Sequence, residues 1–173
     1  MAIDSEDTTR VTWLQRVLIG KNPKRTLARI LVLAAVCFAV YRFVLLPIRV
    51  QGISMLPTFP DKGIHLVNRL AYLSHEPQRG DVVAIRLAGE SVMLLKRIIG
   101  LPGETVAFQD GHAVINGQVL EEPYVKFPCN WEHKPEPVEQ NEYYVVGDNR
   151  SMDFYDHTQG RSERRRIVGK VIR

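Results

Sequence analysis

Two side chains in the sequence have types and neighbours that suit nucleophilic catalysis. Ser54 lies in the segment Gly52-Ile53-Ser54-Met55-Leu56-Pro57-Thr58, and Lys96 lies further along in a run of aliphatic residues. A serine hydroxyl is a weak nucleophile at neutral pH and needs an adjacent base. A lysine amine is such a base only when it is uncharged, and burial among apolar neighbours lowers its pKa in that direction. The pair therefore predicts a serine hydrolase whose general base is a lysine.

Each of these residues also has an ordinary structural interpretation. Gly52 permits unusual backbone dihedrals and Pro57 stiffens the chain, so Ser54 is either displayed on a rigid loop or bonded to its own turn. In an extended strand Lys96 shares a face with aliphatic neighbours two positions away, where it either snorkels to solvent or loses its charge. Arg97 points the opposite way and stays protonated, so we interpret it as a structural or recognition cation.

An apolar run near the N-terminus is long enough to cross a bilayer. Leu27–Leu46 gives roughly the 20 residues that a spanning helix needs, and we expect Pro47 to end it. A cleaved signal peptide would have a shorter apolar core and a small-residue cleavage site, and a buried core helix would not usually follow a cluster of cations. By the positive-inside rule the N-terminus is cytoplasmic and the chain after Pro47 lies outside. The cations before the run are Lys21, Lys24, Arg25 and Arg29.

Beyond this anchor the sequence predicts a mainly β fold. Short alternating or β-branched runs are separated by tight-turn signals at Asp110-Gly111 and Asn116-Gly117. We expect an antiparallel, β-barrel-like catalytic domain with a long surface loop at Glu121–Glu142. The predicted domains are a cytoplasmic tail (1–26), a transmembrane anchor (27–47) and an extracytoplasmic domain (48–173). The predicted strands are Ile64–Arg69, Asp81–Leu87, Val92–Ile99, Thr105–Gln109, Ala113–Ile115, Gln118–Leu120, Tyr143–Val146 and Ile167–Ile172.

Composition excludes several other classes of function. The net charge is +4 and the pI is near 9.2, but much of the basic excess lies before the apolar run and at Arg161–Arg166. No zinc-finger spacing or RNA-binding aromatic motif accompanies it, so no nucleic-acid partner is expected. Cys37 lies inside the apolar run and Cys129 far along the soluble part, so no disulfide is expected. No metal or cofactor motif is found.

Four segments of the sequence occur in a familiar order. They are Ser54-Met55-Leu56-Pro57-Thr58, Arg79-Gly80-Asp81-Val82-Val83, Lys96-Arg97-Ile98-Ile99-Gly100-Leu101-Pro102-Gly103-Glu104 and Gly147-Asp148-Asn149-Arg150. In order and spacing they resemble the nucleophile box, strand box, general-base box and last box of the type I signal peptidases. Four boxes in order are far more specific than one. The resemblance covers the chain from about the anchor onward.

The resemblance implies roles for the matching residues. Ser54 would be the acylating nucleophile, Lys96 the general base, and the Ser54 backbone N–H part of the oxyanion hole. Some family members add a serine hydroxyl two residues before the nucleophile, but that position here is Gly52. Arg97 and Asp148 resemble the family's structural ion pair behind the site. The residues expected to support the oxyanion site and the catalytic pair are Gly52, Met55, Arg97, Asp148, Ser151 and Asp153.

The last box departs from the family pattern, which continues through a serine to Asp-Ser-Arg. Aligned without gaps, the family serine that orients the lysine corresponds to Asp153. An ionised carboxylate touching Lys96 would favour the ammonium and oppose catalysis. We therefore expect Asp153 to point to solvent or to a cation such as Arg150, and the Ser151 hydroxyl to orient the lysine.

The resemblance implies a membrane-anchored serine endopeptidase of the bacterial inner membrane that removes signal peptides from exported preproteins. Its expected partners are these preproteins and the lipid bilayer, and it needs no cofactor. One alternative is a pilin or conjugation-type maturation peptidase with the same mechanism. Another is an inactive membrane-tethered β domain, against which the presence of both Ser54 and Lys96 argues. A Ser-His-Asp hydrolase using His157 lacks a Gly-x-Ser-x-Gly elbow and leaves Lys96 without a role.

Overall fold

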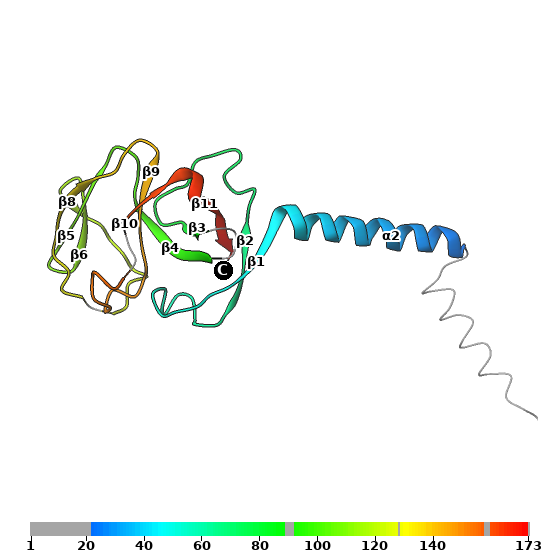
Figure 1. The fold of residues 1–173 in the computed structure, drawn as a ribbon, viewed down its shortest axis with the longest axis horizontal. Coiled ribbons are helices and arrows are strands. Elements are labelled where there is room, and N and C mark those ends of the chain that lie inside the picture. Colours follow the sequence, from blue (N-terminus) through cyan, green and yellow to red (C-terminus); the bar gives the residue numbers. More distant parts are fainter. Residues whose placement is uncertain (1–21, 89–91, 128, 158–159, 173) are drawn as a thin grey trace, which may run out of the picture. The chain divides into compact units, whose positions relative to one another are not determined.

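The computed structural model describes residues 22–88, 92–127, 129–157 and 160–172, and the chain divides into two units between Phe43 and Val44. Most of the predicted cytoplasmic tail lies outside these residues. The first unit contains helix α2 (Pro23–Ala39), which continues as a π-helical turn over Val40–Val44 (Figure 1). Proline is favourable in the first turn because the N–H that it lacks would have no partner there.

The stretch Pro23–Val44 is the one helix among the described residues that is long and apolar enough to cross a membrane. It has 22 residues and a mean hydropathy of 2.1, and none of its apolar window is buried within the protein. An apolar helix without protein around it is suited to lipid, because its backbone hydrogen bonds are satisfied internally. The helix therefore fits the predicted membrane anchor.

The end of the predicted anchor needs correction. The helix stops at Val44 rather than at Pro47, and Leu45–Arg49 forms strand β1. β1 pairs with β2 (Ile64–Asn68) alone and forms an edge of its sheet, a position that tolerates the missing N–H of Pro47. Helix and edge strand are both apolar here, so hydrophobicity alone did not separate them.

A seven-stranded, curled antiparallel sheet dominates the second unit. Its strand order is β1-β2-β11-β3-β4-β9-β10, and every neighbouring pair is antiparallel. Strand β4 pairs with β3 on one side and with β9 on the other (Figure 1). The remaining strands are β3 (Val82–Ala88), β4 (Val92–Gly100), β9 (Glu142–Val146), β10 (Gly160–Glu163) and β11 (Ile167–Ile172), with a short 3₁₀ turn at Arg164–Arg166.

A second, four-stranded antiparallel sheet has the order β7-β6-β5-β8. Asp110 and Gly111 have φ angles of 49° and 77°, and Asn116 and Gly117 have 51° and 81°. Positive φ at both central residues is the signature of the two-residue hairpin turn, so both predicted tight turns are confirmed. The strands are β5 (Thr105–Gln109), β6 (His112–Ile115), β7 (Gln118–Val119) and β8 (His133–Pro137).

The mainly β prediction is confirmed, and each predicted strand matches an observed one to within one residue at either end. Three strands were not predicted: β1, β8 and β10. The sequence of β8 is His-Lys-Pro-Glu-Pro, which carries no hydrophobic alternation and falls in the predicted surface loop. It is a strand because it pairs with the edge of β5.

Candidate active site

The turn that carries Ser54 is held down by buried side chains on either side. Met55 and Phe59 are 1% and 2% exposed and pack in one core cluster with Val50 and Leu95. Burying a side chain of this size contributes about 1.5–3 kcal/mol. Ser54 itself is half-buried, and its N–H and hydroxyl make no hydrogen bond to any described residue. Both groups are therefore available to a ligand.

The last predicted box holds this turn from the other side. The Asn149 N–H donates to the Ser54 carbonyl at 3.0 Å, and Asn149 Nδ2 donates to the Ile53 carbonyl at 3.1 Å. Gly52 has a φ of +103°, a region that favours glycine, and its N–H donates to Asp61 Oδ1 at 2.8 Å. The position two residues before Ser54 thus supplies backbone geometry and no side-chain donor.

Lys96 is buried on an apolar face of β4. It is 3% exposed and stands opposite Val83 of β3, on the face that also carries Leu94 and Ile98. Burial removes solvent from the ammonium and lowers the pKa of Lys96 from 10.5 to about 8. Its amine makes no hydrogen bond or ion pair with any residue that the structure describes. At pH 7 about one lysine in ten is then neutral, as a general base requires.

Strand pairing brings Lys96 next to the Ser54 turn. β4 pairs with β9 so that Arg97 stands opposite Val146, and one step further Gly147 comes opposite Lys96. A side chain on Gly147 would therefore extend over the same face as Lys96. A Cβ built there would collide with the Ser54 carbonyl oxygen. Gly147 thus lets the Ser54 turn pass close to β4 at Lys96, although the two side chains are not hydrogen-bonded to each other before substrate binds.

Arg97, on the opposite face of β4, forms a bidentate ion pair with Asp148. Its Nε and Nη2 donate to the two carboxylate oxygens at 2.8 and 2.6 Å, and its Nη1 donates to the Gly80 carbonyl at 2.7 Å. The Thr58 hydroxyl donates to Asp148 at 2.5 Å, and the Tyr124 ring lies 3.8 Å from the guanidinium. Burial acts to lower the pKa of Arg97, but Asp148 raises it above its ordinary value. The pair links β4, the last box and the end of the Ser54 turn.

The structure corrects the predicted role of Ser151. The residue is exposed, its hydroxyl donates to Asn149 Oδ1 at 2.7 Å, and it makes no hydrogen bond to the buried Lys96. Asp153 is exposed too, and its carboxylate accepts the Tyr155 N–H at 2.9 Å. That position agrees with the expectation that Asp153 points away from the lysine.

Arg150 has a different partner from the one expected. It donates to both oxygens of Glu122 at 3.0 and 2.5 Å and to the Gly147 carbonyl at 2.8 Å, and it is fully buried. It does not pair with Asp153. Glu122 lies in the predicted surface loop, where nothing in the sequence distinguished it from a solvated acid. Only the folded chain brings it under the last box.

His157 does not have the surroundings of a triad base. It is fully buried, and neither ring nitrogen has a hydrogen-bond partner among the described residues. The carboxylate that orients a triad histidine is thus missing, and Asp156 is exposed. Burial, with the positive charges of Lys96 and Arg150, lowers the pKa of His157 to about 4. The Ser-His-Asp alternative therefore lacks its orienting acid.

A groove of about 440 Å³ runs beside Ser54. Its walls include Leu46–Gln51 from β1 and the following loop, and Met93–Leu95 from β4. Among the described residues β1 pairs with β2 alone, and β9 pairs with β4 only from Arg97 onward. Each wall thus has a strand edge without a neighbouring strand. Such edges accept an added strand through main-chain hydrogen bonds.

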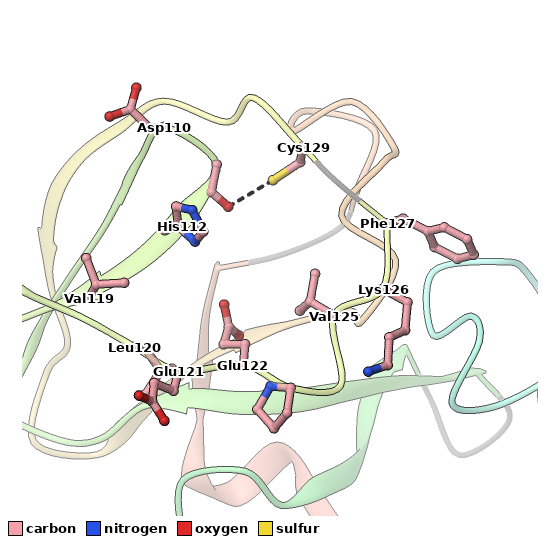
Figure 2. A pocket seen from close by; sticks show the side chains of 12 residues that line it. Asp110, His112, Val119, Leu120, Glu121, Glu122, Val125, Lys126, Phe127 and Cys129 are labelled. Carbon is pink, nitrogen blue, oxygen red and sulfur yellow. Dashed lines mark hydrogen bonds between the residues drawn. The ribbon is translucent and has the colours of Figure 1, made fainter.

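A larger cavity of about 720 Å³ lies elsewhere, between the β5–β6 turn and the loop that follows β7 (Figure 2). None of the predicted catalytic residues lines it. The free thiol of Cys129 donates to the Gly111 carbonyl at 3.0 Å, as Figure 2 shows. Because the groove rather than this cavity contains Ser54, the groove is the candidate active site.

Comparison with known proteins identifies the family of the chain. The family model described as "Signal peptidase, peptidase S26" matches residues 24–172. The chain therefore belongs to the signal peptidase family, peptidase S26. The match includes α2 from its second residue and every strand of the β unit, so it covers every residue of the candidate site.

Individual relatives are similar over most of this chain. A signal peptidase I of Leptolyngbya laminosa is 36% identical over 69% of this chain and 63% of its own length. A probable signal peptidase I-2 of Synechocystis sp. is 31% identical over 69% of this chain and 57% of its own. Signal peptidase I S of Bacillus subtilis is 36% identical over 73% and 75%, respectively. The chain thus spans about three fifths of the length of the first two relatives.

Proposed function

We propose that this protein is a serine endopeptidase that uses Ser54 and Lys96 to cleave signal peptides from preproteins. The observation that carries the proposal is the unpartnered, buried Lys96 next to the Ser54 turn, with a pKa of about 8 caused by burial. Membership of the signal peptidase family supports the substrate class. A lysine kept neutral by its surroundings is the base that a serine nucleophile requires.

In the proposed reaction Ser54 Oγ attacks the scissile carbonyl carbon while neutral Lys96 takes the hydroxyl proton. The oxyanion accepts a hydrogen bond from the Ser54 N–H, which no described residue occupies. The C–N bond then breaks, and the Lys96 ammonium gives its proton to the leaving amine. Water hydrolyses the acyl-enzyme with Lys96 again as base. No step needs a metal or a cofactor.

The substrate is proposed to bind as an extended strand between β1 and β4. Backbone groups of Met93–Leu95 and of β1 would pair with it, which gives affinity without sequence preference. The buried side chains Met55, Val50 and Leu95 form an apolar floor beneath the groove. Such a floor suits small apolar residues just before the cut, as the family resemblance implies.

The anchor is proposed to hold the site at the membrane surface, with the N-terminus in the cytoplasm. Ser54 follows the last residue of the apolar helix by ten positions, and the substrate's signal helix is held in the same bilayer, which raises the effective concentration. External protease added to spheroplasts should digest the β unit and spare the N-terminal tail. Protection of the β unit would contradict this topology.

The test of function is cleavage of a preprotein by the full-length protein in detergent. Wild type should release a mature N-terminus at one site, identified by mass spectrometry, and Ser54→Ala should release none. Ser151→Ala is the matched control, since that hydroxyl is committed to Asn149 on the surface, and it should keep wild-type activity. Cleavage by Ser54→Ala would exclude the proposed nucleophile. Wild-type cleavage of a pilin precursor alone would favour a dedicated maturation peptidase.

A further inference from the structure

The proposed mechanism makes no use of His157, although its side chain stands beside the catalytic pair. Ring atoms Cε1 and Nε2 of His157 lie 2.6 and 2.8 Å from the point that a Cβ on Gly147 would occupy. The Ser54 carbonyl borders the same point. Continuing the β4–β9 register one residue past its last pair, Arg97–Val146, puts Gly147 opposite Lys96. The imidazole therefore occupies space that a side chain on Gly147, just after β9, would otherwise take next to the Ser54 carbonyl, and it is close enough to Lys96 for that charge to act on it.

The polar atoms of this ring need an explanation. Both nitrogens are buried and no described residue meets them with full hydrogen-bond geometry, which is rare for a side chain that is 0% exposed. Backbone groups of Asn149 and of His157 itself lie close enough to act on the pKa of the ring. The charged groups that act on the ring are Lys96 of β4 and Arg150 of the last box, both cations. With no acid beside it, the imidazole is neutral at working pH and keeps one acceptor nitrogen. The Lys96 amine likewise has no hydrogen-bond partner among the described residues.

We propose that His157 is a positioning residue: a change of side-chain rotamer lets its acceptor nitrogen, which is not bonded to Lys96 in the structure, take a hydrogen bond from the Lys96 amine and direct the amine's lone pair toward the Ser54 hydroxyl. The proposal rests on the proposed function of Ser54 and Lys96, and it replaces the role first expected of Ser151. His157 neither gains nor loses a proton in the cycle. The Trp131 ring fixes the imidazole plane through an edge-on contact, with ring centroids 4.8 Å apart at 76°.

Three substitutions separate the hydrogen bond from packing. His157→Leu fills the space and accepts no hydrogen bond, His157→Asn keeps a polar atom near the Nδ1 position, and His157→Gln keeps one near Nε2. The leucine variant should lose about 10²-fold in kcat because the amine is no longer aimed, with little change in KM because His157 does not line the groove. One of the two amide variants should recover most of the lost rate.

The pH dependence of kcat/KM distinguishes loss of the hydrogen bond from a packing defect. An acceptor stabilises the Lys96 ammonium, so its loss in His157→Leu should move the acid limb of kcat/KM to lower pH by about one unit. A packing defect that admits water would move the limb to higher pH, toward the ordinary pKa of lysine. Thermal unfolding checks that each variant is folded; if the leucine variant is not, the comparison of the two amides with wild type carries the test.

Ser162→Ala is the matched control. The Ser162 hydroxyl is also buried and unpartnered, and it lines the same cavity of about 110 Å³ as Lys96, but from β10. It should leave both kcat and the acid limb unchanged. The proposal is overturned if the limb moves in Ser162→Ala and not in the His157 variants, or if both amides match leucine without a shift. Absence of cleavage by wild type, or activity in Ser54→Ala, would instead reject the proposed function.

Discussion

The two faces of strand β4 shift the pKa values of two neighbouring cations in opposite directions. Lys96 and Arg97 are adjacent and similarly buried, at 3% and 9% exposure. Lys96 faces aliphatic side chains without a counter-ion, and burial lowers its pKa to about 8. Arg97 faces Asp148 in a bidentate pair that more than offsets burial and keeps it charged.

The difference shows that one face of β4 can hold a reactive group while the other face fixes the neighbouring segments. An uncompensated buried ammonium is unstable as a charge, so it becomes a base near neutral pH. A buried ion pair has no such reactivity, but it fixes the segments that carry its partners. Here Asp148 is also bonded by Thr58, so the Arg97 face holds the Ser54 turn in place while the Lys96 face supplies the proposed chemistry.

The largest expected effect comes from Lys96→Arg. Arginine keeps the positive charge but cannot accept a proton, so preprotein cleavage should fall by about 10²–10⁴-fold or below detection. On the other face, Arg97→Lys also exchanges one cation for another, but it loses the bidentate pair with Asp148. This variant should keep part of its cleavage activity and have a lower thermal stability. The cleavage rates of both full-length variants should be measured in detergent. A lower rate for Arg97→Lys than for Lys96→Arg would contradict the proposed difference between the two faces of β4.

The second effect concerns stability on the Arg97 face. Arg97→Met should destabilise the β unit by about 3–5 kcal/mol, because Asp148 is left as a fully buried carboxylate without its partner. Thermal unfolding followed by circular dichroism measures the loss. Adding Asp148→Asn to the same chain should recover part of it, since the amide carries no charge. An equal loss in single and double variants would show that the carboxylate is not the cause.

The smallest expected effect is a gain in stability, in contrast to the loss expected for Arg97→Met. Lys96→Met should stabilise the protein by up to about 3 kcal/mol at pH 7, because burial of the ammonium opposes folding. The pKa of Lys96 falls from 10.5 to about 8 on folding, so between these values the unfolded state binds more protons. Wild-type stability should then rise with pH from 8 to 10.5, and the advantage of the variant should shrink over that range. A constant difference across these pH values would contradict the burial argument.

Much of the local structure was predictable from the sequence. Two-residue alternation identified eight strands, and Asp110-Gly111 and Asn116-Gly117 identified two hairpin turns, because both signals depend only on neighbouring residues. The candidate nucleophile and base were also chosen from residue type and spacing. A polar edge strand such as β8 has no such signal, since it is ordered by the strand that it pairs with.

The sequence by itself identified the candidates for chemistry, namely a serine on a constrained turn and a lysine in an aliphatic run. Only the tertiary structure decided what surrounds them. A lysine in such a run either snorkels or is buried, and here covering strands bury it. The same packing turns Ser151 to the surface, pairs Arg150 with Glu122, and puts His157 over Gly147. These contacts join segments far apart in the chain, and burial, which sets the pKa of Lys96, exists only once those segments meet.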